Sequence, residues 1–273
     1  MRLFIQHTTH YDFTRPVAHG LQRLRLMPKS THGQKVIAWE MGLTGLRRET
    51  CYEDHHHNST ALVSVLPGAS AVTITCSGTV ETVDNAGIVG AHTGPMPLWV
   101  FLMQTELTRP GPKMRALDSR LDVCADSSKV LDGLHELADA VLGEVRYEIG
   151  RTDTDTPAEE ALAAGHGVCQ DHAHIFIGTA RLLGIPARYV SGYLMMNDRI
   201  DQEAGHGWAE AHVDGLGWVG FDVSNGISPD PRYVRVASGR DYRDAAPVTG
   251  ISYGPGESVL AVTLAVEQQP AEQ

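Results

Sequence analysis

The sequence has few cysteines, and they lie far apart. Cys51, Cys76, Cys124 and Cys169 are the only four in 273 residues, which is too few and too scattered for a disulfide framework. No uninterrupted apolar run reaches the length of about 18 residues that a membrane-spanning helix needs. The first residues enter strand-like alternation without the apolar core of a signal peptide. These absences predict a reduced, cytoplasmic protein with no membrane partner.

Positive charge is also scarce. The chain has 22 Lys and Arg against 33 Asp and Glu, a net charge of −11 and a pI near 5.6, which argues against general binding to nucleic acid or anionic membranes. No glycine-rich phosphate loop, dinucleotide fingerprint or Gly-x-Ser-x-Gly elbow occurs. With 42% hydrophobic and 20% charged residues, the composition is that of an ordinary soluble globular protein.

The first third of the chain has the pattern of strands. Leu3 and Ile5 alternate with polar neighbours, and residues 71–80 are rich in β-branched side chains. Glycine and proline separate these runs, which is typical of a small antiparallel β-sandwich. We expect this β domain over residues 1–88. A segment rich in glycine and proline at 89–112 connects it to the rest, and its apolar residues 99–103 should pack against a domain.

Helices follow, and strands come after them. Residues 130–142 carry apolar side chains at helical spacing, 156–159 resemble a capping box with proline at the first helical position, and 173–183 are apolar nearly all round, as in a buried helix. Strands are predicted at 187–194, 205–213, 218–222 and 258–266. This order favours an α+β core with helices on an antiparallel sheet, over residues 113–273.

The turn before the buried helix places Cys169 in the first helical turn. There the backbone N–H groups and the positive end of the helix dipole favour a thiolate. A free cysteine is more often a buried, inert residue, so the position alone leaves both interpretations open. Its backbone N–H is a natural donor to an oxyanion, but a second donor is not evident. For Asp171 we favour a surface or capping role over contact with a substrate.

The predicted strand over 205–213 adds an imidazole. His206, Trp208, Glu210 and His212 alternate with small residues that suit close packing on a buried helix, so the four should face a cleft or the opposite surface. The next strand ends in Asp222. A thiol, an imidazole and a carboxylate in this order supply a nucleophile, a base and a group that orients the base. His212 is a weaker candidate for the base than His206, beside which Trp208 would shield the imidazole.

These segments resemble the bacterial transglutaminase-like superfamily of cysteine proteases. The resemblance lies in residues 167–171, 184–193, 206–210 and 217–222 of the core, in 7–11, 16–17 and 23–28 of the β region, and in 239–242 and 247–250 near the C-terminus. It implies an N-terminal antiparallel β-sandwich before a papain- or transglutaminase-like core. Two departures are that Gly207 stands where alanine is usual, and that Val-Ser-Asn follows Asp222 where Pro-Thr-Asn is common.

The resemblance implies Cys169 as nucleophile, His206 as base and Asp222 as the third member of a catalytic triad. The expected reaction is cysteine-dependent acyl transfer at amide bonds of a peptide or protein, with hydrolysis favoured over transfer to an amine as in a transglutaminase. A non-catalytic peptide-binding scaffold with the same fold is the competing interpretation. The β domain could shape the cleft, bind a partner or mediate formation of a homodimer.

No cofactor or metal is expected. The run of residues 54–57 and the pair His7 and His10 could bind a metal, but consecutive residues of a strand point to alternate faces. His172 and His174 near Cys169 suggest a zinc hydrolase as a third alternative, although residues so close on one helix diverge and no second ligand pair follows at zinc spacing. Calcium, which some relatives require, has no visible acidic ligand loop.

Overall fold

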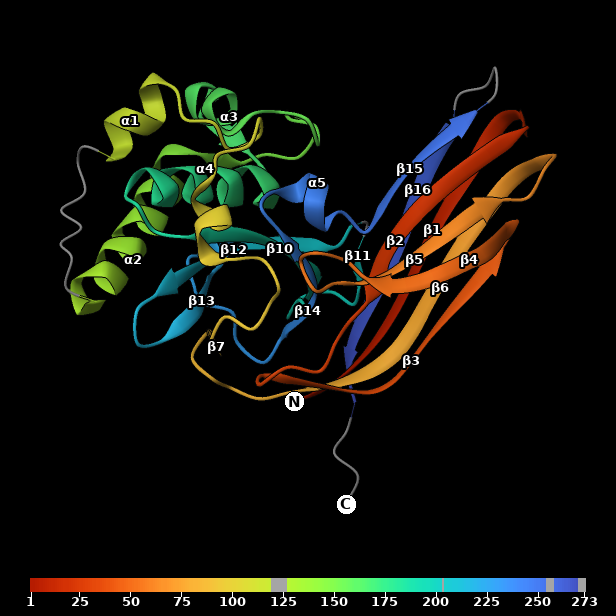
Figure 1. The fold of residues 1–273 in the computed structure, drawn as a ribbon, viewed down its shortest axis with the longest axis horizontal. Helices are drawn as coiled ribbons and strands as arrows, with labels where there is room; N and C mark the ends of the chain where they lie inside the picture. Colours follow the sequence, from red (N-terminus) through yellow and green to blue (C-terminus); the bar gives the residue numbers. More distant parts are fainter. Residues whose placement is uncertain (119–126, 203, 254–257, 270–273) are drawn as a thin grey trace.

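Antiparallel sheets are the main regular structure of the computed structural model, which describes residues 1–118, 127–202, 204–253 and 258–269 (Figure 1). Two sheets form a sandwich and a third belongs to the helical part. The first sheet has the order β11 (Asp201–Gln202), β16 (Ser258–Gln268), β1 (Arg2–Val17), β6 (Ala69–Thr82) and β3 (Gln34–Thr44). The second has the order β15 (Val248–Tyr253), β2 (His19–Met27), β5 (Ser59–Val65) and β4 (Leu46–Glu53).

The sandwich has an apolar interior, as the alternation in the sequence predicts. Inward side chains of the two sheets form one buried cluster that includes Leu24, Val63, Val72 and Ile74. Along β6 from Val72 onward, buried side chains alternate with partly or fully exposed ones, because successive residues of a strand point to opposite faces. The expected strand over 71–80 is therefore present as the central part of β6.

The third sheet supports the helices. Its order is β14 (Tyr233–Gly239), β10 (Ala187–Leu194), β12 (His206–Val213), β13 (Gly217–Phe221) and β7 (Ile88–Gly90). The helices are α1 (Pro112–Asp118), α2 (Ser127–Glu144), α3 (Ala158–Ala164), α4 (Cys169–Leu182) and α5 (Tyr242–Ala245), with 3₁₀ turns η1 (Leu98–Leu102) and η2 (Val223–Asn225). A short parallel pair joins β8 (Arg146–Tyr147) to β9 (His166–Gly167).

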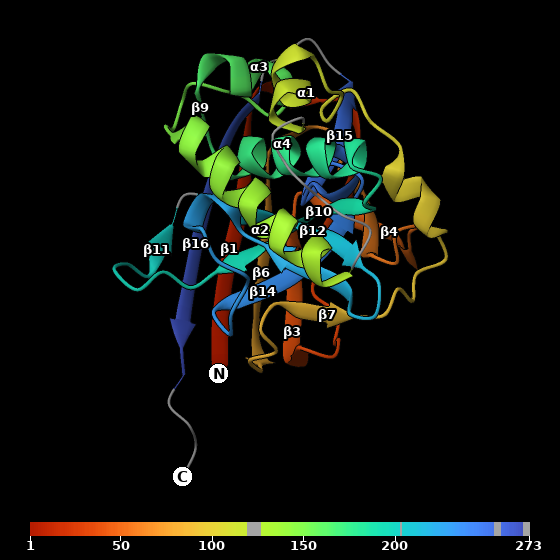
Figure 2. The same ribbon diagram turned by 90° about the vertical axis from the view of Figure 1, so that its left-hand side faces the viewer.

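One face of the third sheet receives α4. Ala209, Ala211 and Val213 of β12 share a buried cluster with Phe176 and Ile177 of α4. Small side chains on the strand let the helix come close, as the alternation predicts. Figure 2 shows α4 running across the sheet with α2 in front of it. The coarse prediction of a mostly antiparallel protein with helices between its strand regions is confirmed.

The opposite face of the third sheet packs on the sandwich. Tyr193 and Val234 of this sheet form a cluster with Leu3, Ile5 and Val80 of the first sheet. Trp208 and Glu210, expected to face a cleft or a surface, are 3% and 0% exposed. Both line a small cavity of about 60 Å³ on this face, so they face a narrow cleft covered by packed strands and loops and not an open surface.

The C-terminal strands return to the N-terminal region. β16 pairs with β1 from Leu3 opposite Gln268 to Phe13 opposite Ser258, and β15 pairs with β2. β15 and β16, which follow the helical part in sequence, thus complete both sheets of the sandwich. The predicted boundaries at residues 88 and 112 stay predictions, and the strand pairing adds that the chain crosses back after β14.

Glu159 caps a different helix from the one predicted. The predicted capping box needs its carboxylate at the start of α3, but Pro157 is the N-cap of α3 and no side chain caps that end. Glu159 instead accepts hydrogen bonds from the backbone N–H groups of Gly111, Lys113 and Met114 at 2.7–3.1 Å. The carboxylate therefore satisfies the exposed donors at the start of α1.

No helix in the described ranges is long and apolar enough to cross a membrane. Cys51 is exposed, Cys76 is buried and Cys169 is partly buried, and all three are free thiols. Cys124 lies outside the described residues.

Gly207 is one of the two departures from the family pattern, and a steric clash explains why a larger residue does not fit at this position. A Cβ at this position would lie 2.0 Å from the hydroxyl oxygen of Tyr189, which is 3% exposed in the core. We expect Gly207→Ala to lower the free energy of unfolding by about 1–3 kcal/mol, as overpacking does, measured by urea unfolding. Tyr189→Phe should restore part of the loss in the double variant.

Gly143→Ala is the matched control for this prediction, because an added Cβ there meets nothing within 4 Å. Equal unfolding midpoints for Gly207→Ala and the wild type would contradict the proposed clash.

Candidate active site

Cys169 is the first residue of α4. Its side chain is partly buried, and the N–H groups of the first helical turn have no partner within the helix. Val168, the N-cap residue, has extended backbone angles of φ −119° and ψ −175°. The abrupt change from extended chain to helix presents the thiol at the positive end of a buried helix.

Asp171 holds this turn in place. Its Oδ2 accepts hydrogen bonds from the backbone N–H of Val168 at 2.8 Å and from the Thr152 hydroxyl at 2.7 Å. The carboxyl group is fully buried, and burial raises its pKa above the ordinary value. The capping role favoured from the sequence agrees with these contacts, and Thr152 is a partner that the sequence did not indicate.

His206 and Asp222 form a close pair. His206 Nε2 donates to Asp222 Oδ2 at 2.6 Å, and their side chains are 8% and 1% exposed. The charge of Cys169 also acts on this imidazole, so the thiol lies near the ring, and Nδ1 is the ring nitrogen that the bond to Asp222 leaves free for it. The structure thus brings together the three residues that the sequence proposes, from the start of α4, the start of β12 and the end of β13.

Two further residues hold Asp222, and sequence reasoning missed both. The Tyr233 hydroxyl and the Asn225 side-chain amide each donate to Asp222 Oδ2 at 2.7 Å. Asn225 follows Asp222 within one 3₁₀ turn, so the Asp-x-x-Asn spacing was a signal for it. Tyr233 comes from β14, and only the folding of the sheet brings it to the carboxylate.

The electrostatics favour an ion pair. Burial alone would lower the pKa of His206, but the charge of Cys169 and the hydrogen bond to Asp222 outweigh it and raise the pKa to about 10. Burial would raise the pKa of Asp222, yet hydrogen bonds from His206, Asn225 and Tyr233 hold it below its ordinary value. At neutral pH the result is an imidazolium at His206 paired with the Asp222 carboxylate.

The imidazole is enclosed by aromatic rings. The ring of Trp208 stacks on His206 with centroids 6.2 Å apart, and Tyr233 lies tilted against it at 6.0 Å. His212 is remote from this group and lies beside Trp218 and Asp214. The apolar walls exclude water from the base, which strengthens its interactions with the two charged partners.

The histidines beside Cys169 do not converge on it. His172 uses both ring nitrogens, on the Ser224 hydroxyl at 2.7 Å and on the Val145 carbonyl at 3.0 Å. His174 is fully buried and accepts from the backbone N–H of Tyr242 at 3.0 Å, and burial lowers its pKa to about 3. These contacts give both residues structural roles in α4 and weaken the zinc-hydrolase alternative.

Among the described residues, one group has the proximity of metal ligands. His55, His56 and Asp244 have ligand atoms within 4.8 Å of one another. Asp244 Oδ2 already accepts from His56 Nε2 at 3.1 Å and from Arg240 Nε at 2.9 Å. A guanidinium on the same carboxylate competes with a cation, so these contacts indicate a bridge between the 53–58 turn and α5.

Comparisons with known proteins agree with this architecture. A model of the transglutaminase-like superfamily matches residues 119–223, and a model of the bacterial transglutaminase-like N-terminal region matches residues 3–81. Two mycobacterial relatives are each 28% identical in sequence to this chain, and each alignment covers 97% of it. They are uncharacterized proteins of Mycobacterium leprae and Mycobacterium tuberculosis H37Rv, covered over 98% and 92% of their own lengths.

A solved structure shares the fold over the whole chain. The crystal structure of "a Putative Cysteine Protease from Cytophaga hutchinsonii" superposes with a TM-score of 0.74 at 21% identity, covering 100% of this chain and 92% of that one. Family-model matches in both halves and one common fold lead to the same conclusion. The chain belongs to the transglutaminase-like superfamily, and it carries the bacterial transglutaminase-like N-terminal region before its core.

Proposed function

We propose that the protein is a cysteine-dependent acyl transferase acting on amide bonds, most simply a peptidase or amidase, with Cys169, His206 and Asp222 as its triad. The observation that carries the proposal is the position of the His206 imidazole. Its Nε2 donates to the Asp222 carboxylate at 2.6 Å, and it lies near enough to the Cys169 thiol that the charge of Cys169 raises the imidazole pKa. A histidine with a purely structural role in the core would not need to lie between a carboxylate and a thiol.

Acylation begins with attack of the Cys169 thiolate on the amide carbonyl carbon. The C–S bond forms, and the carbonyl π electrons move to the oxygen, where the backbone N–H of Cys169 can donate to the oxyanion. When this intermediate collapses, the C–N bond breaks and His206 gives its proton to the leaving amine. Asp222 keeps the imidazole oriented through Nε2, with Tyr233 and Asn225 holding the carboxylate.

Deacylation completes the cycle. Neutral His206 removes a proton from a water molecule that attacks the thioester, and breaking of the C–S bond returns the thiolate and releases the acid. An amine in place of water would give a transglutaminase reaction by the same steps. The family resemblance favours water, and we propose peptides or proteins as substrates. We also propose the cytoplasm, where reducing conditions keep a catalytic thiol free.

The first test is the alkylation rate of each cysteine with iodoacetamide at pH 7, followed by mass spectrometry on the wild type and His206→Ala. A thiol with an ordinary pKa of about 8.5 is about 3% thiolate at this pH. We therefore expect Cys169 to react up to about 30-fold faster in the wild type than in the variant. The exposed Cys51 is the internal control, because its rate should be equal in both proteins.

Equal rates for Cys169 in the two proteins would refute the Cys–His pair and would favour the non-catalytic scaffold. If the pair is present, a peptide library incubated with and without a primary amine separates the two reactions. Products that gain only water indicate hydrolysis, and products that carry the amine indicate transamidation.

The raised pKa of His206 predicts a pH dependence of stability. A group whose pKa rises on folding stabilises the folded state fully below its unfolded pKa, about 6.5, and loses this contribution as pH rises through its folded value of about 10. The difference in melting temperature between the wild type and His206→Gln, measured by calorimetry, should shrink from pH 6 to pH 10.5. A difference independent of pH would contradict the charged imidazole.

A further inference from the structure

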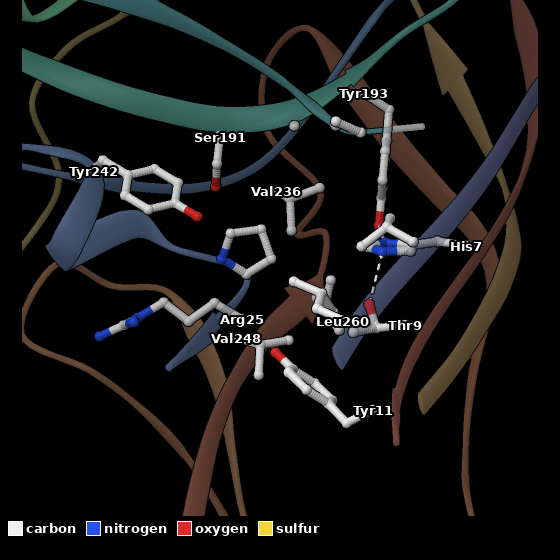
Figure 3. A pocket seen from close by; sticks show the side chains of 16 residues that line it. His7, Thr9, Tyr11, Arg25, Ser191, Tyr193, Val236, Tyr242, Val248 and Leu260 are labelled. Atoms are coloured by element: carbon white, nitrogen blue, oxygen red, sulfur yellow. Dashed lines mark hydrogen bonds between the residues drawn. The ribbon is translucent and has the colours of Figure 1, made fainter. Parts of the chain in front are cut away.

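A cavity of about 320 Å³ lies between the sandwich and the third sheet. One wall comes from β1, β2 and β16 of the sandwich, and the other from β10, β14 and the start of α5 (Figure 3). Its size is at the lower end of the range for small-ligand sites. It is large enough for one side chain of a bound polypeptide.

The cavity opens next to His206. Its lining includes Ala204 and Gly205, both exposed, and His206 directly follows Gly205 in the chain. Tyr242, which also lines the cavity, lies near enough to Cys169 that the negative charge there adds to burial in raising the pKa of the tyrosine. A ligand in the cavity would therefore lie close to both reacting groups.

Motifs that the triad does not use converge here. The segment 7–11 supplies His7, Thr9 and Tyr11, 239–242 supplies Tyr242, and 247–250 supplies Val248. In the sequence the first of these segments is more than 200 residues from the other two. The folding of β15 and β16 back onto β1 and β2 brings them together around one space.

No free charge faces the cavity from the described residues that line it. The guanidinium of Arg25 points away in Figure 3 and donates to Asp54 at 2.8 Å, with both side chains buried. His7 uses both ring nitrogens, on the hydroxyls of Tyr193 and Thr9, and burial lowers its pKa to about 4, so it is neutral at pH 7. A charged ligand group would lose its hydration here without gaining a partner.

Two hydroxyls remain available. The rings of Tyr11 and Tyr242 reach toward the cavity from opposite walls (Figure 3). Within the described part of the chain, neither phenol hydroxyl has a hydrogen-bond partner, whereas Ser191 donates to the Ala245 carbonyl at 2.7 Å. Apolar side chains such as Val236, Leu260 and Val262 form the remaining surface.

We propose that this cavity binds an uncharged, mainly apolar side chain of the substrate polypeptide, close to the amide bond that Cys169 attacks. The two phenols can hydrogen-bond the neighbouring peptide groups or a polar atom of that side chain. The N-terminal β region then has a direct role in the reaction, because it builds one wall of a specificity pocket. The inference rests on the function proposed above.

The test uses peptidyl vinyl sulfones that differ in one side chain, Phe, Leu, Glu or Lys, placed one to three residues from the electrophile. Their second-order rate constants for reaction with Cys169 are divided by the rate constant for iodoacetamide, a reagent that carries no amino-acid side chain to enter the cavity. In at least one position, the Phe and Leu probes should react about tenfold faster than the Glu and Lys probes, a ratio within the range of apolar pockets.

The matched variants lie side by side on β16. Leu260 lines the cavity but is 53% exposed, so it lies at the edge. Leu260→Trp narrows the cavity and should slow the Phe probe about tenfold without changing the iodoacetamide rate. Val259→Trp changes a neighbouring residue that is 64% exposed and outside the cavity lining, so its rates should equal those of the wild type. If Leu260→Trp does not fold, Leu260→Ala enlarges the same cavity and should shift the preference toward larger aromatic side chains.

Equal rates for charged and apolar probes, or equal effects of the two tryptophan variants, would overturn the pocket while leaving the triad intact. An iodoacetamide rate at Cys169 no faster than at Cys51 would instead refute the proposed function, and the pocket proposal would fall with it.

Discussion

Cys169→Ala should lower amide-bond turnover by at least about 10⁴-fold, because the nucleophile, the thioester and the partner of the imidazolium disappear together. Members of a triad act as a unit, so His206→Ala and the Cys169→Ala, His206→Ala double variant should have losses of similar size. Turnover is measured by mass spectrometry on a mixed peptide library. A covalent adduct on Cys169 after reaction with an activated ester identifies the acyl-enzyme.

Cys51→Ala is the control, because it removes an exposed thiol and leaves the site unchanged. It should retain the turnover of the wild type. Circular dichroism establishes that each variant is folded. Turnover that survives in Cys169→Ala would contradict covalent catalysis at this residue, and an acyl group found on another cysteine would move the nucleophile.

The second large effect concerns stability. Glu210 is fully buried between two arginines, with its carboxylate 2.6 Å from Arg188 Nε and 2.9 Å from Arg235 Nε. Burial would raise the pKa of Glu210, but the two guanidinium groups outweigh it and hold the pKa below the ordinary value. The three residues belong to β12, β10 and β14, so this ion cluster joins three strands of the third sheet.

Glu210→Gln should lower the free energy of unfolding by about 3–5 kcal/mol. The amide keeps the shape of the side chain but leaves the positive charges of Arg188 and Arg235 without a counter-ion. The side chains of these arginines are only 11% and 20% exposed. Desolvated charges without a partner are strongly unfavourable. The measurement is guanidinium chloride unfolding at pH 7, with fluorescence of the four tryptophans as the signal.

Glu49→Gln provides the comparison. Glu49 pairs with Arg47 on β4, where both side chains are substantially exposed, and exposed pairs contribute little. Its unfolding midpoint should match that of the wild type. If Glu210→Gln unfolds at the same denaturant concentration as Glu49→Gln, the buried cluster does not stabilise the sheet.

Local features of the site could be predicted from the sequence. The glycine-bearing turn, the apolar helix after Cys169 and the strand that begins at His206 depend on periodicity and on the preferences of neighbouring residues. The small residues of β12 also predict the face on which α4 packs. The order of Cys169, His206 and Asp222 then proposes a triad, because each residue lies at the end of a predicted element.

Contacts between distant segments could not be predicted in this way. Tyr233 reaches Asp222 only because β14 lies beside β10, and Glu159 caps α1 because α1 and α3 pack together. The alternation in β12 indicates two faces, but it does not say that sheet and loop packing covers the face with Glu210. A strand has the same local pattern whether its polar face meets water or buried arginines.

The sequence by itself determined the elements, the thiol at a helix start and the identity of the proposed triad, since these follow from interactions over a few residues. The tertiary structure decided how the C-terminal strands return to the sandwich, which groups hold Asp222, and that Tyr11 and Tyr242 face one cavity from opposite walls. The physical reason is that pairing between segments 200 residues apart depends on the summed burial of whole sheets, which no local pattern specifies.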